Sequence, residues 1–197
     1  MNITGIKQAK KDTNRVHLYE NEKYIGTVYI DMLLKYHITE RENVDDDDIN
    51  KALTESNNLK LFNLSVSYIA RRARSEREIK NYISQKIFKY KWNPENINTN
   101  VIIDKLYNYK YLDDKSFAEM WVKERIKKGK GPVRLRQELI MKGVDKEIIN
   151  EALHNIDIED ENISKEKLTE KYLKNKIFKS EIEKKWKLSQ YLRSRGF

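Results

Sequence analysis

One stretch decides the fold: LRQELIMKG at residues 135–143, which recurs in altered form at 79–86 and 188–196. Each copy places two aliphatic side chains four residues apart, with a basic side chain three residues after the second. Side chains at this spacing share one face of an α-helix, so each copy predicts a helix with one buried face. The later copies end in Gly143 and Gly196, and glycine is common just past a helix end. The copies begin 56 and 53 residues apart, which indicates a tandem helical repeat.

A second pattern precedes each copy of this stretch. It consists of a large apolar residue, an aromatic residue four positions later, an aliphatic residue beside the aromatic one, and a basic residue one turn further on. The three sets are Leu64, Tyr68, Ile69 and Arg72; Phe117, Trp121, Val122 and Arg125; and Leu168, Tyr172, Leu173 and Lys176. Each copy is therefore expected to follow an amphipathic helix of its own.

A third apolar helix is expected after the first two copies, over residues 101–107 and 148–153. None is expected after the last copy, because the chain ends at Phe197. The predicted repeats are 51–110, 111–157 and 158–197, the last of them lacking its third helix.

Repeats of this size predict the architecture as well. A unit of about 50 residues buries little apolar surface alone, so neighbouring repeats must share a continuous core. We therefore predict a mainly α-helical protein, with tandem three-helix repeats forming an elongated curved rod. The aromatic residues Tyr68, Trp121 and Tyr172 are expected in this core, and a ligand-binding role for them is the weaker alternative.

The expected helix starts carry capping residues. Ser75 and Glu78 form a capping box, and Asp113 lies where a side chain can cap the next helix. In the pair Gly131 and Pro132, the proline suits the first helical position. These acids therefore have a structural explanation that is stronger than a catalytic one.

Residues 1–50 differ from the rest and are predicted to form a small β segment with a short helix. Residues 15–19 and 24–28 alternate in the manner of two strands of a hairpin, and residues 3–6 could supply a third strand. The acidic run at 45–48 fits a metal site poorly, because it lacks the spaced acids, glycine and distal glutamate of a calcium loop. It is better explained as the start of a helix over 49–57, where carboxylates meet free N–H groups.

The basic charge belongs to the helical part alone. Residues 1–58 have 8 basic and 11 acidic residues, a net charge of −3, whereas residues 59–197 have 32 and 20, a net charge of +12. Such a field favours a polyanion or an acidic protein surface as the partner. With 39% hydrophobic residues the chain is not expected to be disordered. The absence of cysteine and of long apolar runs suits a monomeric cytoplasmic protein that does not enter a membrane.

No recognisable catalytic or metal-binding motif is present. The three histidines lie in unrelated segments, and the missing cysteines exclude a thiol nucleophile and thiolate metal sites. The segment Lys128–Gly131 lacks the glycine spacing and the serine or threonine of a phosphate-binding loop. We therefore expect no enzyme activity, no cofactor and no metal.

What the sequence offers instead is clustered basic residues near the start of the second helix in each repeat. A curved face with three such clusters would follow a polyanion or a periodic filament through phosphate contacts. Alternatively, these residues merely solvate the outer surface. The candidate binding residues are Arg71, Arg72, Arg74, Arg77, Lys123, Lys127, Lys128, Lys130, Arg134, Arg136, Lys185, Lys187, Arg193 and Arg195.

Several of these segments resemble one known family, the RecX regulators. Residues 74–79 (RSEREI) are similar to its Arg-Ser-x-x-Glu-Leu signature, and residues 111–118 (YLDDKSFA) to its Leu-Asp-Asp-x-x-Phe-Ala signature. Residues 130–144 resemble its second-repeat motif, and residues 193–197 (RSRGF) resemble the Arg-Gly-Phe that closes the second helix of its third repeat. Residues 86–88 depart from the family, which usually has a Lys-Gly pair there.

The resemblance implies a protein that binds the RecA–DNA filament and modulates, mostly by inhibition, the recombinase, ATPase and coprotease activities of RecA. It implies roles in DNA repair, recombination and the SOS response. The implied partners are the RecA filament and the phosphates of single- or double-stranded DNA, with no active site or cofactor. Two alternatives stay open: a general nucleic-acid-binding protein without a RecA role, and a helical scaffold that docks acidic protein partners.

Overall fold

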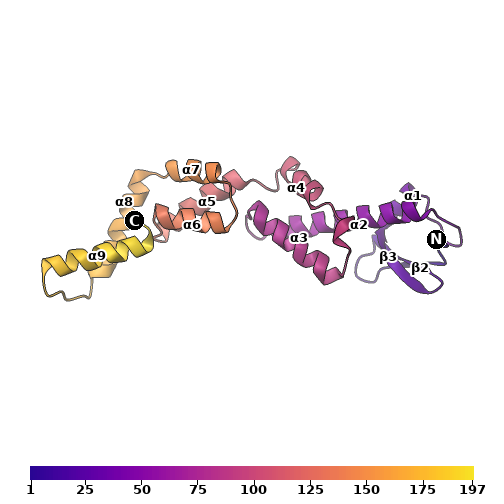
Figure 1. Ribbon diagram of the computed structural model, residues 1–197, viewed down its shortest axis with the longest axis horizontal. Helices are drawn as coiled ribbons and strands as arrows, with labels where there is room; N and C mark the ends of the chain where they lie inside the picture. The colour runs from indigo at the N-terminus through magenta and orange to yellow at the C-terminus, as the bar shows by residue number, and fades with distance from the viewer. The chain divides into compact units, whose positions relative to one another are not determined.

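The computed structural model describes residues 1–197 and confirms a mainly α-helical protein with a small three-stranded antiparallel sheet (Figure 1). The chain divides into two compact units. Unit 1 comprises Met1–Arg71 and Tyr82–Asn108, and unit 2 comprises Arg72–Asn81 and Tyr109–Phe197. No helix is both long enough and apolar enough to cross a membrane.

The sheet of unit 1 contains β1 (Gly5–Gln8), β2 (Arg15–Glu20) and β3 (Lys23–Tyr29) in that spatial order. The predicted hairpin is present, and Asn21 and Glu22 at its turn both have positive φ, as a tight turn between twisted strands requires. The predicted third strand lies two residues later than expected, because β1 pairs with β2 from Gly5 onward.

Two helices follow the sheet, α1 (Ile30–Lys35) and α2 (Asp46–Ile69). The expected short helix over 49–57 is instead the first part of α2, since neither glycine nor proline interrupts residues 46–69. Asp45 caps this helix by accepting a hydrogen bond from the Asp47 N–H, which confirms the acidic run as a helix start. Helix α2 packs on the sheet through a shared core. Buried members of this core are Ile3, Val16, Leu18, Val28, Ile38, Val44, Ile49 and Ala52.

Three further elements contribute to unit 1: the later turns of α3 (Glu76–Tyr90), the 3-10 turn η1 (Pro94–Asn96) and α4 (Thr99–Asn108). The first copy of the repeated stretch lacks a terminal glycine, and α3 accordingly runs on to Tyr90. Its end is marked by Lys91, which adopts a left-handed conformation with φ of 55°.

Unit 2 is built from the first turn of α3 together with α5 (Asp114–Lys127), α6 (Pro132–Met141) and α7 (Lys146–His154). Helices α8 (Ile158–Leu173) and α9 (Glu181–Arg195) complete it. The predicted cap at Asp113 is confirmed, because its carboxylate accepts from the Ser116 N–H. Helices α5, α6 and α7 enclose one core, whose buried members are Phe117, Ala118, Val122, Ile126, Leu135, Leu139, Val144, Ile149 and Ala152.

The three repeated aromatic residues are less buried than the sequence pattern predicts. Tyr68, Trp121 and Tyr172 are each half-buried, with Trp121 packed on the edge of the unit 2 core. The physical reason is that each ring meets a polar or aromatic partner on the second helix of its repeat, as described below. The boundaries proposed for the repeats remain a proposal.

Candidate nucleic-acid interface

Two equivalent junctions within unit 2 join the second helices of successive repeats. At each one, a glycine just after a helix lies against the first turn of the preceding second helix. At the first junction Gly143, after α6, contacts the Arg77 side chain of α3. At the second junction Gly196, after α9, contacts the Arg134 backbone of α6. Both glycines have positive φ, 74° and 92°, so the predicted C-terminal caps are also docking points.

The second junction gathers predicted cations from two repeats. The Gly131 N–H donates to the Arg195 carbonyl at 2.8 Å, and the Val133 N–H donates to the Gly196 carbonyl at 3.2 Å. These main-chain bonds bring the start of α6 and the end of α9 together. The predicted cations on these two segments are Lys130, Arg134, Arg193 and Arg195. We call these four residues the second-junction cations.

At the first junction, by contrast, a carboxylate pairs with two of the predicted cations, Arg72 and Arg74. Glu78 accepts hydrogen bonds from Arg72 at 2.7 Å and from Lys142 at 2.9 Å, and Arg74 lies 3.8 Å away. Burial alone would raise the pKa of Glu78, but the bonds and charges of Arg72 and Lys142 outweigh it and lower the pKa to about 2. Glu78 thus remains ionised and ties α3 to the end of α6.

A second carboxylate, Glu138, is buried and organises the face between α5 and α6. It accepts two bonds from Arg125, at 2.7 and 2.8 Å, and one from the Trp121 indole N–H at 3.1 Å. Burial would raise the pKa of Glu138, yet the Arg125 hydrogen bond and charge lower it overall. Arg134 lies 3.8 Å from the same carboxylate. Glu138 therefore offsets part of the positive charge of the second-junction cations.

Sequence reasoning missed Lys142 and Arg125 as members of this surface. The two networks border one cavity of about 500 Å³. It is lined by Arg77, Glu78, Asn81, Trp121, Arg125, Arg134, Glu138, Met141 and Lys142. Both missed residues occupy repeated basic positions of the sequence pattern. Arg125 lies one helical turn after the aromatic Trp121, and Lys142 lies three residues after the second aliphatic residue, Leu139.

Those repeated basic positions hold cations over aromatic rings. Lys86 lies 4.9 Å from the centre of the Tyr82 ring. Lys142 lies 5.0 Å from the centre of the Trp121 ring. Arg195 lies 5.3 Å from the centre of the Tyr191 ring. These distances allow a cation–π interaction worth about 0.5–1 kcal/mol at exposed sites. The three bases therefore pack on their own repeats as well as contributing charge.

The α8–α9 pair repeats the arrangement with two tyrosines. Tyr172 and Tyr191 stack with ring centres 4.3 Å apart, and Lys176 lies 3.4 Å from the centre of the Tyr172 ring. Tyr68 and Tyr82 stack in the same way within unit 1, at 4.1 Å. In α5–α6 the second tyrosine is replaced by Glu138, which explains why Trp121 donates a hydrogen bond there instead of stacking.

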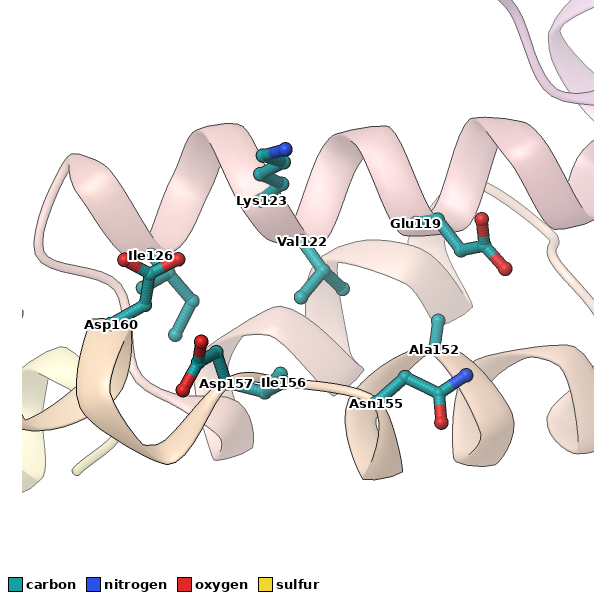
Figure 2. Close-up of a pocket in the computed structure, with 9 residues that line it drawn as sticks. All are labelled: Glu119, Val122, Lys123, Ile126, Ala152, Asn155, Ile156, Asp157 and Asp160. Carbon is teal, nitrogen blue, oxygen red and sulfur yellow. The ribbon is translucent and has the colours of Figure 1, made fainter.

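Lys123 lies near several carboxylates but forms no ion pair with them. It lies on α5 at a cavity of about 420 Å³, which Glu119, Asp157 and Asp160 also line. Figure 2 shows Val122 pointing from α5 into this cavity and the carboxylates distributed around it. The surrounding negative charge makes Lys123 less suited to contact with a phosphate.

The remaining candidates fall into two groups. Five lie within 4.0 Å of a carboxylate: Arg72, Arg74, Lys128, Arg134 and Lys187. Eight form no ion pair: Arg71, Arg77, Lys127, Lys130, Arg136, Lys185, Arg193 and Arg195. Arg136 is nevertheless held by a 2.6 Å bond to the Asn150 side chain. Arg71 belongs to unit 1, and the other members of both groups belong to unit 2.

Comparison with known proteins decides the family. Residues 113–153 match the family model described as RecX, second three-helix domain. A Regulatory protein RecX from Bacillus licheniformis is 33% identical over 196 residues, covering 99% of this chain and 72% of the relative. The chain belongs to the RecX family. A second RecX relative, from Clostridium perfringens, is 31% identical and has 90% of its length covered.

Solved structures share the fold of this RecX-family chain. A crystal structure of regulatory protein RecX aligns with all of the chain and 94% of its own length, with a TM-score of 0.71 at 24% identity. RecX from Lactobacillus salivarius aligns with 73% of the chain and 90% of its own length, with a TM-score of 0.64. The family membership makes the chain a regulatory protein with a three-helix domain at α5–α7.

Proposed function

We propose that this RecX-family chain binds the RecA–DNA filament and lowers the recombinase, ATPase and coprotease activities of RecA. The observation that carries the proposal is family membership over nearly the whole chain. The second-junction cations supply a surface suited to the polyanionic part of such a filament. Three of them, Lys130, Arg193 and Arg195, form no ion pair.

The mechanism follows from how a ligand shifts an equilibrium. Cations of unit 2 contact DNA phosphates, while the adjoining helical surface contacts RecA. Phosphate contact supplies affinity that depends on salt and not on base sequence. Binding one state of the filament more tightly than another shifts RecA towards the bound state, and the shift cannot exceed the difference in binding free energy.

A triple charge reversal of Lys127, Lys128 and Arg193 to glutamate tests whether exposed cations of unit 2 contact the filament. These side chains are exposed and lie outside the Glu78 and Glu138 networks, so folding should be preserved. Inhibition of RecA-driven strand exchange should weaken at least tenfold. A control with the same change in charge replaces three exposed lysines without ion pairs, Lys89, Lys110 and Lys146. Equal loss of inhibition in both variants would assign the effect to net charge alone.

The two other functions make different predictions. A general nucleic-acid-binding protein binds single-stranded DNA tightly without RecA, and its affinity falls steeply as salt rises. A scaffold for acidic partners binds no DNA and leaves RecA unaffected. Fluorescence anisotropy with a labelled oligonucleotide, with and without RecA, separates these cases.

A further inference from the structure

A large cavity in unit 1 lies outside the surface discussed so far. It has a volume of about 1000 Å³ and is formed by the sheet, the middle of α2 and the segment that follows α3. Its floor includes Gly26 and Thr27 of β3 and Leu53 of α2. A methyl group on Gly26 would clash with Leu53, so strand and helix are in direct contact there.

Cations dominate the charged residues of this cavity although residues 1–58 have a net charge of −3. Its charged lining residues are Lys7, Lys10, Lys11, Asp12, Arg15, Lys60 and Lys91. Asp12 is the only acid among them, and it lies 3.4 Å from Lys60. The remaining cations form no ion pair. The cavity therefore has a local excess of positive charge, which suits an anionic ligand.

Arg15 is the second observation that favours an anionic ligand. Its side chain lies in the cavity wall, and the residue is only 8% exposed. One terminal nitrogen donates to the Thr27 carbonyl at 2.9 Å, and the guanidinium lies 5.1 Å from the centre of the Tyr29 ring. Its Nε is buried and has no hydrogen-bond partner. A buried guanidinium without a carboxylate partner is costly, and its planar donors match a phosphate well.

Aromatic rings accompany the cations. The cavity is lined by Tyr19, Tyr24, Tyr90 and Trp92. Tyr24 is 54% exposed and Tyr90 is 38% exposed, so a ligand can reach both residues. Tyr90 and Trp92 lie on either side of Lys91, and their ring centres are 4.8 Å apart. Rings of this kind stack on nucleobases at about 1–3 kcal/mol per base.

We propose that this cavity binds a nucleotide, with the phosphate held by Arg15 and neighbouring lysines and the base stacked on the exposed rings. A free anion such as phosphate would use only the cations. An acidic peptide would leave the aromatic faces unstacked. The nucleotide is either free in solution or part of a single strand, since both present a phosphate beside a base. This site goes beyond the proposed function, because none of its residues belongs to the unit 2 surface.

Isothermal titration of the full chain with AMP, adenosine and inorganic phosphate tests the chemistry, and a labelled fifteen-residue oligothymidylate tests the strand. We expect AMP or the oligonucleotide to bind, with adenosine and phosphate each weaker than AMP by tenfold or more. Lys91→Glu and Tyr24→Ala should each weaken binding at least fivefold. Lys23→Glu is the matched control, because Lys23 is exposed on the same hairpin and does not line the cavity.

Each outcome bears on the site. Tight AMP binding that Lys91→Glu weakens supports a free nucleotide, and oligonucleotide binding that Lys91→Glu weakens supports a strand. Arg15→Met should abolish binding of both AMP and the oligonucleotide. If the Arg15→Met protein does not fold, Lys91→Glu and Tyr24→Ala decide the question. Absence of binding to both probes, or binding unaffected by Lys91→Glu and Tyr24→Ala, overturns the proposal. The triple variant of Lys127, Lys128 and Arg193 should bind AMP normally, which separates this site from the RecA proposal.

Discussion

Replacing Glu78 with glutamine removes the charge that joins α3 to the end of α6 while keeping the side-chain shape. The wild-type carboxylate is 17% exposed and is bonded to Arg72 and Lys142. Its pKa, lowered from the usual 4.5 to about 2, corresponds to at most about 3.4 kcal/mol of stability at neutral pH. Solvent screening reduces this ceiling, so we expect Glu78→Gln to cost about 2 kcal/mol.

The pH dependence gives the sharper test. A carboxylate whose pKa is lower in the folded state stabilises the protein above its unfolded pKa, and this stability is lost as pH falls through the folded pKa. For Glu78 the loss runs from about pH 5 to about pH 2. By the same relation, the upper limit on the contribution of Glu78 to the free energy of unfolding falls from about 3.4 kcal/mol at pH 7 to about 1.4 kcal/mol at pH 3.

Urea unfolding of wild type and Glu78→Gln, followed by circular dichroism at pH 7 and pH 3, measures this difference. The two proteins should differ by about 2 kcal/mol at pH 7 and by less than 1 kcal/mol at pH 3. Lys142→Met supplies the double-mutant cycle, and the two substitutions should be less than additive. An equal cost of Glu78→Gln at both pH values would refute the assignment of the stability to the ionised carboxylate.

Three further outcomes are expected. Gly196→Ala should destabilise the protein by about 2–3 kcal/mol, because φ is 92° and the added methyl would lie 2.5 Å from the Arg134 backbone nitrogen. Gly143→Ala should also cost about 2 kcal/mol, because φ is 74° and its methyl would lie 2.7 Å from the Arg77 Cβ, which is fixed to the α3 backbone; an unchanged melting temperature would contradict this. The double variant Lys127→Glu and Lys128→Glu should reduce the salt dependence of binding to single-stranded DNA, lowering the magnitude of the slope of log affinity against log salt by about 2 without changing stability. An unchanged slope would show that neither lysine contacts phosphate.

Much of the helical framework was predictable because its determinants are local. The apolar spacing in residues 135–143 and 188–196, each of which ends in glycine, predicts helices that the structure contains as α6 and α9. The cap at Asp113 is equally local. The expected helix over 49–57 was too short, although the absence of glycine and proline from residues 46–69 is itself a local signal; only the packing of the sheet on the first half of α2 depends on long-range contacts.

The state of the candidate cations depends on long-range contacts and so escaped sequence reasoning. Arg72 is paired with Glu78, and the same carboxylate is paired with Lys142, which lies 64 residues beyond Glu78 in the chain. Clustering in sequence therefore identified basic segments but could not separate paired from unpaired side chains. The same limit hid the cavity around Arg15, because its lysines come from β1, the turn after it, α2 and the position just after α3, which are far apart in the sequence.

The central claim, that this RecX-family chain acts on the RecA filament, is tested most directly by RecA ATP hydrolysis on single-stranded DNA. The chain is added to preformed filaments at rising concentration, and hydrolysis is compared with filaments that receive buffer or the Lys127, Lys128 and Arg193 triple variant. The proposal predicts a saturable fall in hydrolysis with the wild-type chain and a fall that needs at least tenfold more of the triple variant. Unchanged hydrolysis at saturating wild-type chain would contradict it.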